Sequence, residues 1–172
     1  ESFDAVMMVG YHSEAGSEAN SLAHTLSSDA VAIRINGKAA SEFTVHALAS
    51  SMLGVPTVFV SGDKGLIDHV AEASPHITGC AVKEGRGQST ITMTPSAAVK
   101  AIRQGAEASL EGDLSKCLLH IPDHLAVEIT YGNPVLAYRH SWYPGMVHAG
   151  ERTIRFESEN YFDVLRMLNY VT

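Results

Sequence analysis

The feature that most limits the fold of this chain is an uninterrupted, mostly apolar run at residues 55–61, VPTVFVS. A strand with apolar residues at successive positions is buried on both faces, as in a parallel sheet covered by helices. Residues 6–9 form a second such run, and residues 78–83 indicate a third strand. Because helical patterns separate these strands, the sequence predicts an α/β fold with a mainly parallel, three-layer sheet built from about residues 1–12 and 55–112.

A second pattern predicts a smaller antiparallel layer beside that sheet. Apolar residues alternate with more polar ones over residues 125–131 and again around residues 154–156, as in strands with one exposed face. Residues 29–35 also read as a strand, and Asn36-Gly37 is a strong signal for a tight hairpin. We therefore expect residues 25–40 and 124–157 to form this α+β layer. The helix that begins at Thr94-Pro95 should bury one face, made of Val99, Ile102, Ala106 and Leu110.

Composition narrows the class of protein. The 172 residues carry a net charge of −7, which argues against nucleic acid, since such partners require clustered Lys and Arg. No apolar run approaches the roughly 18 residues of a membrane span, and residues 1–4 lack the basic start and apolar centre of a signal peptide. Cys80 and Cys117 are isolated, so we interpret them as reduced core cysteines of a cytoplasmic protein.

Three residues are candidates for a chemical site. His12 follows the strand at residues 6–9, and ligands bind at the carboxyl ends of strands in open α/β sheets. His24 comes next, and Glu42 stands at the start of a helical pattern. Imidazole nitrogen and carboxylate oxygen are ordinary zinc ligands, although a compact local metal motif is absent. From these residues alone, a hydrolytic zinc site and a set of scattered structural residues both remain open.

Other polar residues have two interpretations each. Asp63, at the end of the strand at residues 55–61, is either a site residue or a helix cap. Lys83 and Arg86 are placed to receive an anion such as a peptide carboxylate, or else belong to a mobile surface loop, which we favour. His46 is either a partner of Glu42 or a surface residue, and we favour the surface. We interpret the remaining six histidines as structural or surface residues.

Several motifs occur in an order that resembles one family. They are Gly10-Tyr11-His12, the lone His24, Asn36-Gly37, Glu42, and the segments 55–63 (VPTVFVSGD) and 81–85 (AVKEG). Together they resemble the zinc D-aminopeptidases of the dipeptide-transport operon, the DppA-like family, over essentially the whole chain. The resemblance implies that His12 and Glu42 bind metal, that His24 is a catalytic residue, and that two zinc ions activate a water molecule.

The chain also departs from that family. There, an N-terminal stretch carries an Asp-x-Glu pair and a further His, all metal ligands, and no segment of this sequence corresponds to it. We therefore expect residues 1–172 to be the carboxyl-terminal part of such an enzyme, completed by a missing N-terminal segment or a partner chain. The alternative is that His46 or another local residue replaces the lost ligands.

The resemblance further implies a closed homo-oligomer that cleaves short peptides with an amino-terminal D-residue. Two other functions remain open. One is hydrolysis of a different small amide on the same scaffold, because selectivity resides in loops such as 13–23 and 84–90. The other is a non-catalytic subunit without metal.

Overall fold

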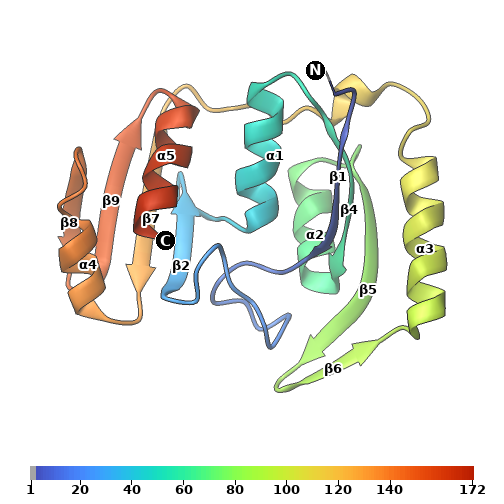
Figure 1. The fold of residues 1–172 in the computed structure, drawn as a ribbon, viewed down its shortest axis with the longest axis horizontal. Coiled ribbons are helices and arrows are strands. Elements are labelled where there is room, and N and C mark those ends of the chain that lie inside the picture. Colours follow the sequence, from blue (N-terminus) through green and yellow to red (C-terminus); the bar gives the residue numbers. More distant parts are fainter. Residues whose placement is uncertain (1–2) are drawn as a thin grey trace.

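The computed structural model describes residues 3–172, so the first two residues of the expected sheet core lie outside it. Its strands form two sheets, a four-stranded one in the order β1-β4-β5-β6 and a five-stranded one in the order β3-β2-β7-β9-β8. Figure 1 shows them side by side. The architecture confirms the α/β class.

The four-stranded sheet consists of β1 (Val6–Tyr11), β4 (Thr57–Asp63), β5 (Thr78–Arg86) and β6 (Ser89–Thr92). The first three strands are parallel, and β6 folds back antiparallel to β5. Every residue of β4 is buried, as expected of a central strand that is apolar at successive positions.

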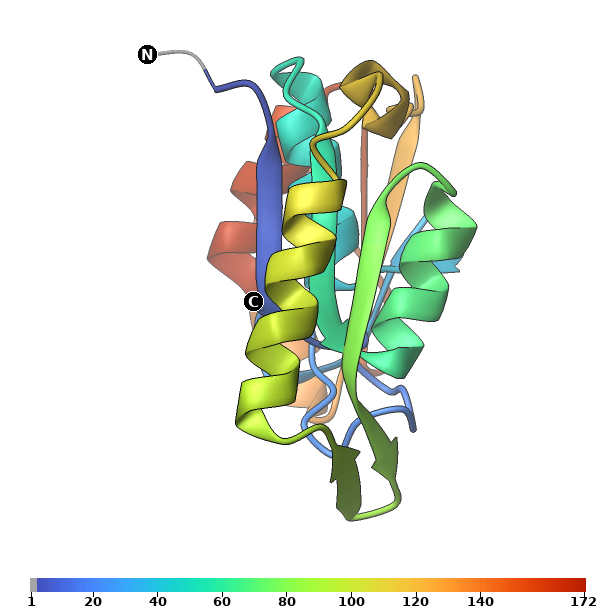
Figure 2. The ribbon, with the colours of Figure 1, turned by 90° about the vertical axis from the view of Figure 1, so that its right-hand side faces the viewer.

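Helices cover both faces of this sheet. On one face lie α1 (Glu42–Met52) and α2 (Lys64–Ala73), which contact each other through an edge-to-face pair of Phe43 and His69. On the other lies α3 (Pro95–Ala108), so close that a Cβ on Gly105 would be 2.7 Å from the ring of Phe59. Figure 2 shows the sheet between α2 and α3. This is the predicted three-layer arrangement.

The five-stranded sheet is antiparallel throughout. Its strands are β2 (Ala30–Ile35), β3 (Lys38–Ala39), β7 (Leu125–Tyr131), β8 (Met146–Gly150) and β9 (Thr153–Ser158). Asn36 and Gly37 both have positive φ, 51° and 78°, as a tight hairpin between β2 and β3 requires. The helices α4 (Pro134–His140) and α5 (Tyr161–Val171) pack against this sheet, and the short η1 (Leu114–Cys117) lies in the connection after α3.

Helix α1 belongs to both hydrophobic cores. Val45 and Leu48 pack into the core of the antiparallel sheet, whereas Phe43 and Ala47 pack into the core of the parallel sheet. Its start is fixed by a capping box between Ser41 and Thr44. Figure 1 shows α1 between the two sheets, with its first turn directed toward the end where β1 finishes.

Two local expectations were wrong. The face of α3 expected to be buried is largely open: Val99 is 62% exposed and Leu110 53% exposed, while Ile102 and Ala106 are half-buried. The segment predicted as a mobile surface loop at Lys83 and Arg86 is instead the paired hairpin of β5 and β6. Within residues 3–172, no helix is both long and apolar enough to cross a membrane.

Candidate functional site

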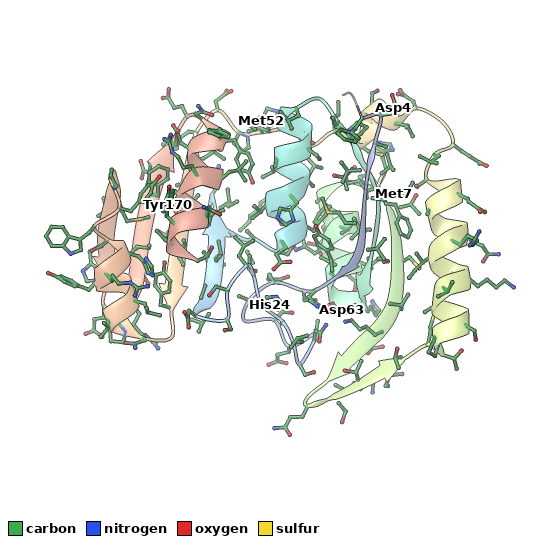
Figure 3. All side chains as sticks on the ribbon, in the orientation of Figure 1. Asp4, Met7, His24, Met52, Asp63 and Tyr170 are labelled. Carbon is green, nitrogen blue, oxygen red and sulfur yellow. The ribbon has the colours of Figure 1, made fainter. Side chains whose placement is uncertain are left out.

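The parallel strands bring three functional side chains to one edge of the sheet. His12 directly follows β1, Asp63 is the last residue of β4, and Lys83 lies near the end of β5. Parallel strands end at the same edge, which is where α/β sheets place their ligands. Figure 3 shows His24 and Asp63 at this end of the sheet.

The three candidates from the sequence lie close together. The ring centroids of His12 and His24 are 5.5 Å apart, and His24 Nε2 is 3.5 Å from Glu42 Oε1. All three side chains are half-buried. The cluster therefore joins the end of β1, the loop after it and the first turn of α1.

The hydrogen bonds of His24 fix its tautomer. His24 Nδ1 donates to the carbonyl oxygen of Leu22 at 2.7 Å, because that oxygen can only accept. In the neutral ring Nε2 then has no hydrogen and presents its lone pair to Glu42. Glu42 Oε1 already accepts from the backbone N–H of Leu26 at 2.9 Å. Two acceptors that face each other are stabilised by a proton or a cation between them.

His12 is surrounded by donors. Its Nδ1 lies 3.3 Å from Lys83 Nζ and 3.3 Å from Asn20 Nδ2. An ammonium group only donates, so Nδ1 accepts and the hydrogen of the neutral ring is on Nε2. Burial, followed by the charges of Lys83 and His24, lowers the pKa of His12. The neutral imidazole, which is the form that binds metals, is therefore favoured.

Asp63 anchors the loop that carries these groups. It is completely buried; its Oδ1 accepts from Ser13 Oγ and Leu66 N, and its Oδ2 from Ser13 N and Asn20 Nδ2. Burial raises the pKa of Asp63, but these hydrogen bonds outweigh it and the net pKa lies below the ordinary value. Asp63 therefore caps α2, as one interpretation proposed, and also fixes the segment that follows His12.

Two glycines hold the middle of the same loop. Gly85 N donates to Ala19 O at 2.9 Å, and a Cβ on Gly85 would be 2.4 Å from that oxygen. A Cβ on Gly65 would be 2.3 Å from Ala19 Cβ. Only glycine permits both approaches, which pack the loop at Ala19 against α2 and β5. Four residues of this loop line an open groove of about 760 Å³ together with residues 85–87; they are Ser17, Glu18, Asn20 and Ser21.

Tyr11 and His46 form a second pair behind the cluster. Tyr11 Oη lies 2.9 Å from His46 Nδ1, and burial, together with the charge of Glu42, raises the pKa of Tyr11. His46 is half-buried, so the favoured surface interpretation was wrong. Its contact runs to the residue before His12 rather than to Glu42.

Sequence reasoning missed several of these residues. Ser13, Glu14 and Asn20 were predicted only as part of the loop at residues 13–23. In the structure Glu14 Oε2 lies 3.6 Å from His69 Nδ1, and Asn20 contacts both His12 and Asp63. Ser13 was detectable, because it adjoins a candidate at a strand end. Asn20 carried no local signal.

The residues present match zinc in the type of their donors. The imidazole of His12 in its neutral form and the carboxylate of Glu42 are the nitrogen and oxygen donors that zinc takes. Ligation through His12 Nε2 requires the other tautomer, in which Lys83 can no longer donate to Nδ1. Among residues 3–172, no three His, Cys, Asp or Glu side chains are already arranged around a common metal position. The described residues therefore offer donors of the type that zinc takes, without a complete set of ligands.

Comparisons with known proteins give matches to D-aminopeptidases that extend over most of the chain. The family model described as D-aminopeptidase, peptidase family M55, matches residues 1–170. No curated protein matches the sequence. A solved structure, the Zn-dependent D-aminopeptidase DppA from Bacillus subtilis, described as a self-compartmentalizing protease, superimposes with a TM-score of 0.86 at 21% identity. The match covers 98% of this chain and 64% of that one.

Proposed function

We propose a function from the premise that this chain belongs to the D-aminopeptidase family. It acts in a zinc-dependent aminopeptidase that releases an amino-terminal D-residue from short peptides. The observation that carries the proposal is the convergence of His12, His24 and Glu42 at the carboxyl edge of the parallel sheet. The family and the fold support peptidase chemistry, and the donor types support zinc.

In this proposal His12 and Glu42 supply part of the ligand set for two zinc ions. Bound zinc would lower the pKa of a water molecule and polarise the scissile carbonyl. His24 moves the proton: its Nδ1 is held by Leu22 O, so Nε2 is free to accept a proton and later return it to the leaving amine. Asp63 contributes indirectly, because it holds the loop that positions the histidines.

The function is tested with D-alanyl and L-alanyl amides and with three variants of the complete protein. His24→Ala should keep its zinc but lose about a hundredfold or more in turnover. Glu42→Ala should lose zinc first. His76→Ala is the control, because its exposed side chain makes no contact with the cluster. Equal loss of zinc in His24→Ala and Glu42→Ala would make His24 a ligand and refute the assignment of roles.

The two other functions predict different results. A hydrolase for another small amide would bind zinc and fail to prefer the D-alanyl substrate. A non-catalytic subunit would bind no zinc and hydrolyse neither substrate. The zinc content of the purified protein, followed by the pair of amides, separates the three.

We also propose that a further polypeptide segment, an N-terminal one or a separate chain, pairs with β1 and supplies the remaining ligands. Two observations support it. In the described part of the chain β1 pairs with β4 alone, and it exposes Met7 (38%) and Val9 (59%) on the side of α3. Figure 3 shows Met7 on that side. A free strand edge with apolar neighbours favours association.

Expression of residues 1–172 alone tests this part of the proposal. Aggregation, or a metal-free fold that an added N-terminal segment converts to a zinc-loaded one, would support the second segment. A soluble, zinc-loaded and active product would refute it and favour a local replacement ligand such as His46.

The assembly of the complete protein is a further part of the proposal. The solved D-aminopeptidase is described as self-compartmentalizing, and we propose that the complete protein forms a closed oligomer that admits short peptides only. Light scattering at micromolar concentration should then give a mass several times that of one chain. A monomer would contradict the oligomer.

A further inference from the structure

Lys83 is a half-buried cation that forms no ion pair with a carboxylate in residues 3–172. Its one polar contact is with His12 Nδ1, at 3.3 Å, and Asn20 Nδ2 competes for the same nitrogen. Among the described residues, Lys83 takes part in no ion pair. An ammonium group has three N–H donors, so most of its capacity is unused.

Three carboxylates of the site make their contacts with groups other than Lys83. Asp63 pairs with Lys83 in the register of β4 and β5, but its two oxygens accept four hydrogen bonds from other groups. Glu42 Oε1 accepts from the backbone N–H of Leu26 and faces His24 Nε2 at 3.5 Å, and Glu14 Oε2 faces His69 Nδ1 at 3.6 Å. Among the described residues, the chain thus places a positive charge in the site, and none of these three carboxylates forms an ion pair with it.

Such an arrangement stabilises an anion that comes from outside. A partly desolvated charge is unfavourable without a partner, and its attraction for an anion is stronger than in water. The contact with His12 is also the one that disappears if His12 uses its other tautomer to bind metal. Lys83 then needs another acceptor within reach of His12.

We propose that Lys83 is an anion-binding residue of this site and that it holds a negatively charged oxygen of the substrate. The oxygen is either the carboxylate of a short peptide or the oxyanion that develops on the scissile carbonyl. The inference rests on the proposed peptidase function and extends it to recognition of the substrate. Arg86 differs from Lys83 in two ways: its side chain is exposed, and it forms an ion pair with Glu84.

The test compares Lys83→Gln and Lys83→Arg with a control, Lys100→Gln, in the complete zinc-loaded protein. Lys100 is exposed on α3 and makes no contact with the site. The substrates are D-alanyl-D-alanine and its carboxyl-terminal amide. Lys83→Gln should lose about a hundredfold in kcat/KM, Lys83→Arg should retain much of the activity, and Lys100→Gln should match the wild type.

The two substrates identify the source of the anion. A decrease in kcat/KM of Lys83→Gln on D-alanyl-D-alanine alone assigns Lys83 to the peptide carboxylate, and this decrease should come mainly from a higher KM. An equal decrease in kcat/KM on both substrates assigns Lys83 to the oxyanion, and this decrease should come mainly from a lower kcat. Unchanged kcat/KM on both would overturn the proposal.

Two further measurements distinguish anion binding from a structural role. Lys83→Gln should keep the zinc content and urea midpoint of the wild type; loss of zinc would mean that Lys83 only positions His12, and would overturn the proposal. Inorganic phosphate, titrated by calorimetry at constant ionic strength, should bind at least tenfold more weakly to Lys83→Gln. If the wild type hydrolyses neither substrate, the proposed peptidase function is wrong, and the titration with phosphate alone tests the role of Lys83. Equal affinity of phosphate for the wild type and Lys83→Gln, or no binding of phosphate to the wild type, would overturn that role.

Discussion

Replacement of Asp63 by Asn should lower the free energy of unfolding by about 2–6 kcal/mol. Asp63 is completely buried and accepts four hydrogen bonds through two oxygens. Asn keeps one of those oxygens; with that oxygen at the helix cap, where it accepts from Leu66 N, the NH₂ group faces two donors, Ser13 N and Asn20 Nδ2. A buried donor left without an acceptor costs about 1–3 kcal/mol, which gives the range for two. The helix cap is not the cause, since Asn caps helices as well as Asp does.

Urea unfolding followed by circular dichroism measures this change. The matched control is Asp113→Asn: Asp113 caps η1 and accepts from Ser115 N and Oγ, but it is exposed, so water can replace it. We expect the control to lose less than about 1 kcal/mol. Equal losses in the two variants would refute the reasoning that buried, competing donors make Asp63 important.

Three further predictions concern the same framework. The pKa of Asp63 is lowered in the folded protein. Its contribution to the free energy of unfolding is therefore fully present above the pKa of the unfolded state and is lost as the pH falls through the pKa of the folded state. Below about pH 4, the free energy of unfolding should fall less steeply with decreasing pH in Asp63→Asn than in the wild type. Gly85→Ala should cost about 1–3 kcal/mol through its collision with Ala19 O and make the loop more sensitive to limited proteolysis, whereas Gly132→Ala, where the nearest atom is at 3.6 Å, should do neither. Gly37→Ala should lower the urea-derived stability by about 1–2 kcal/mol, because φ is 78° there, and no loss would contradict the strained hairpin.

The sequence predicted those parts of the fold that depend on local pattern. The continuous apolar run of β4, the alternation in β7 and the positive φ angles at Asn36 and Gly37 all follow from residues adjacent in the chain. Apolar periodicity alone misplaced the outer face of α3, because the same pattern occurs whether or not another layer covers the helix.

The site was predictable only in outline. A strand end marked His12, since the carboxyl edge of a parallel sheet is set by topology. The contacts of His12 with Asn20 and Lys83 were not predictable, because they depend on how a loop packs against β5. Lys83 lies 71 residues after His12 in the chain. The pairing of His46 with Tyr11 was missed for the same reason, as it requires α1 to be docked on β1.

The way α1 packs into both cores has a consequence for folding. The strands of the two sheets alternate along the chain. The strand β1 belongs to the parallel sheet, β2 and β3 to the antiparallel one, β4 to β6 again to the parallel sheet, and β7 to β9 to the antiparallel one, with α1 between β3 and β4. No single cut separates the two sheets, so neither sheet corresponds to one contiguous segment of the chain. A helix that presents Phe43 to one core and Leu48 to the other is buried fully only when both sheets have formed. Native-state hydrogen exchange should therefore find the two sheets opening together as one cooperative unit, with α1 among the last segments to exchange.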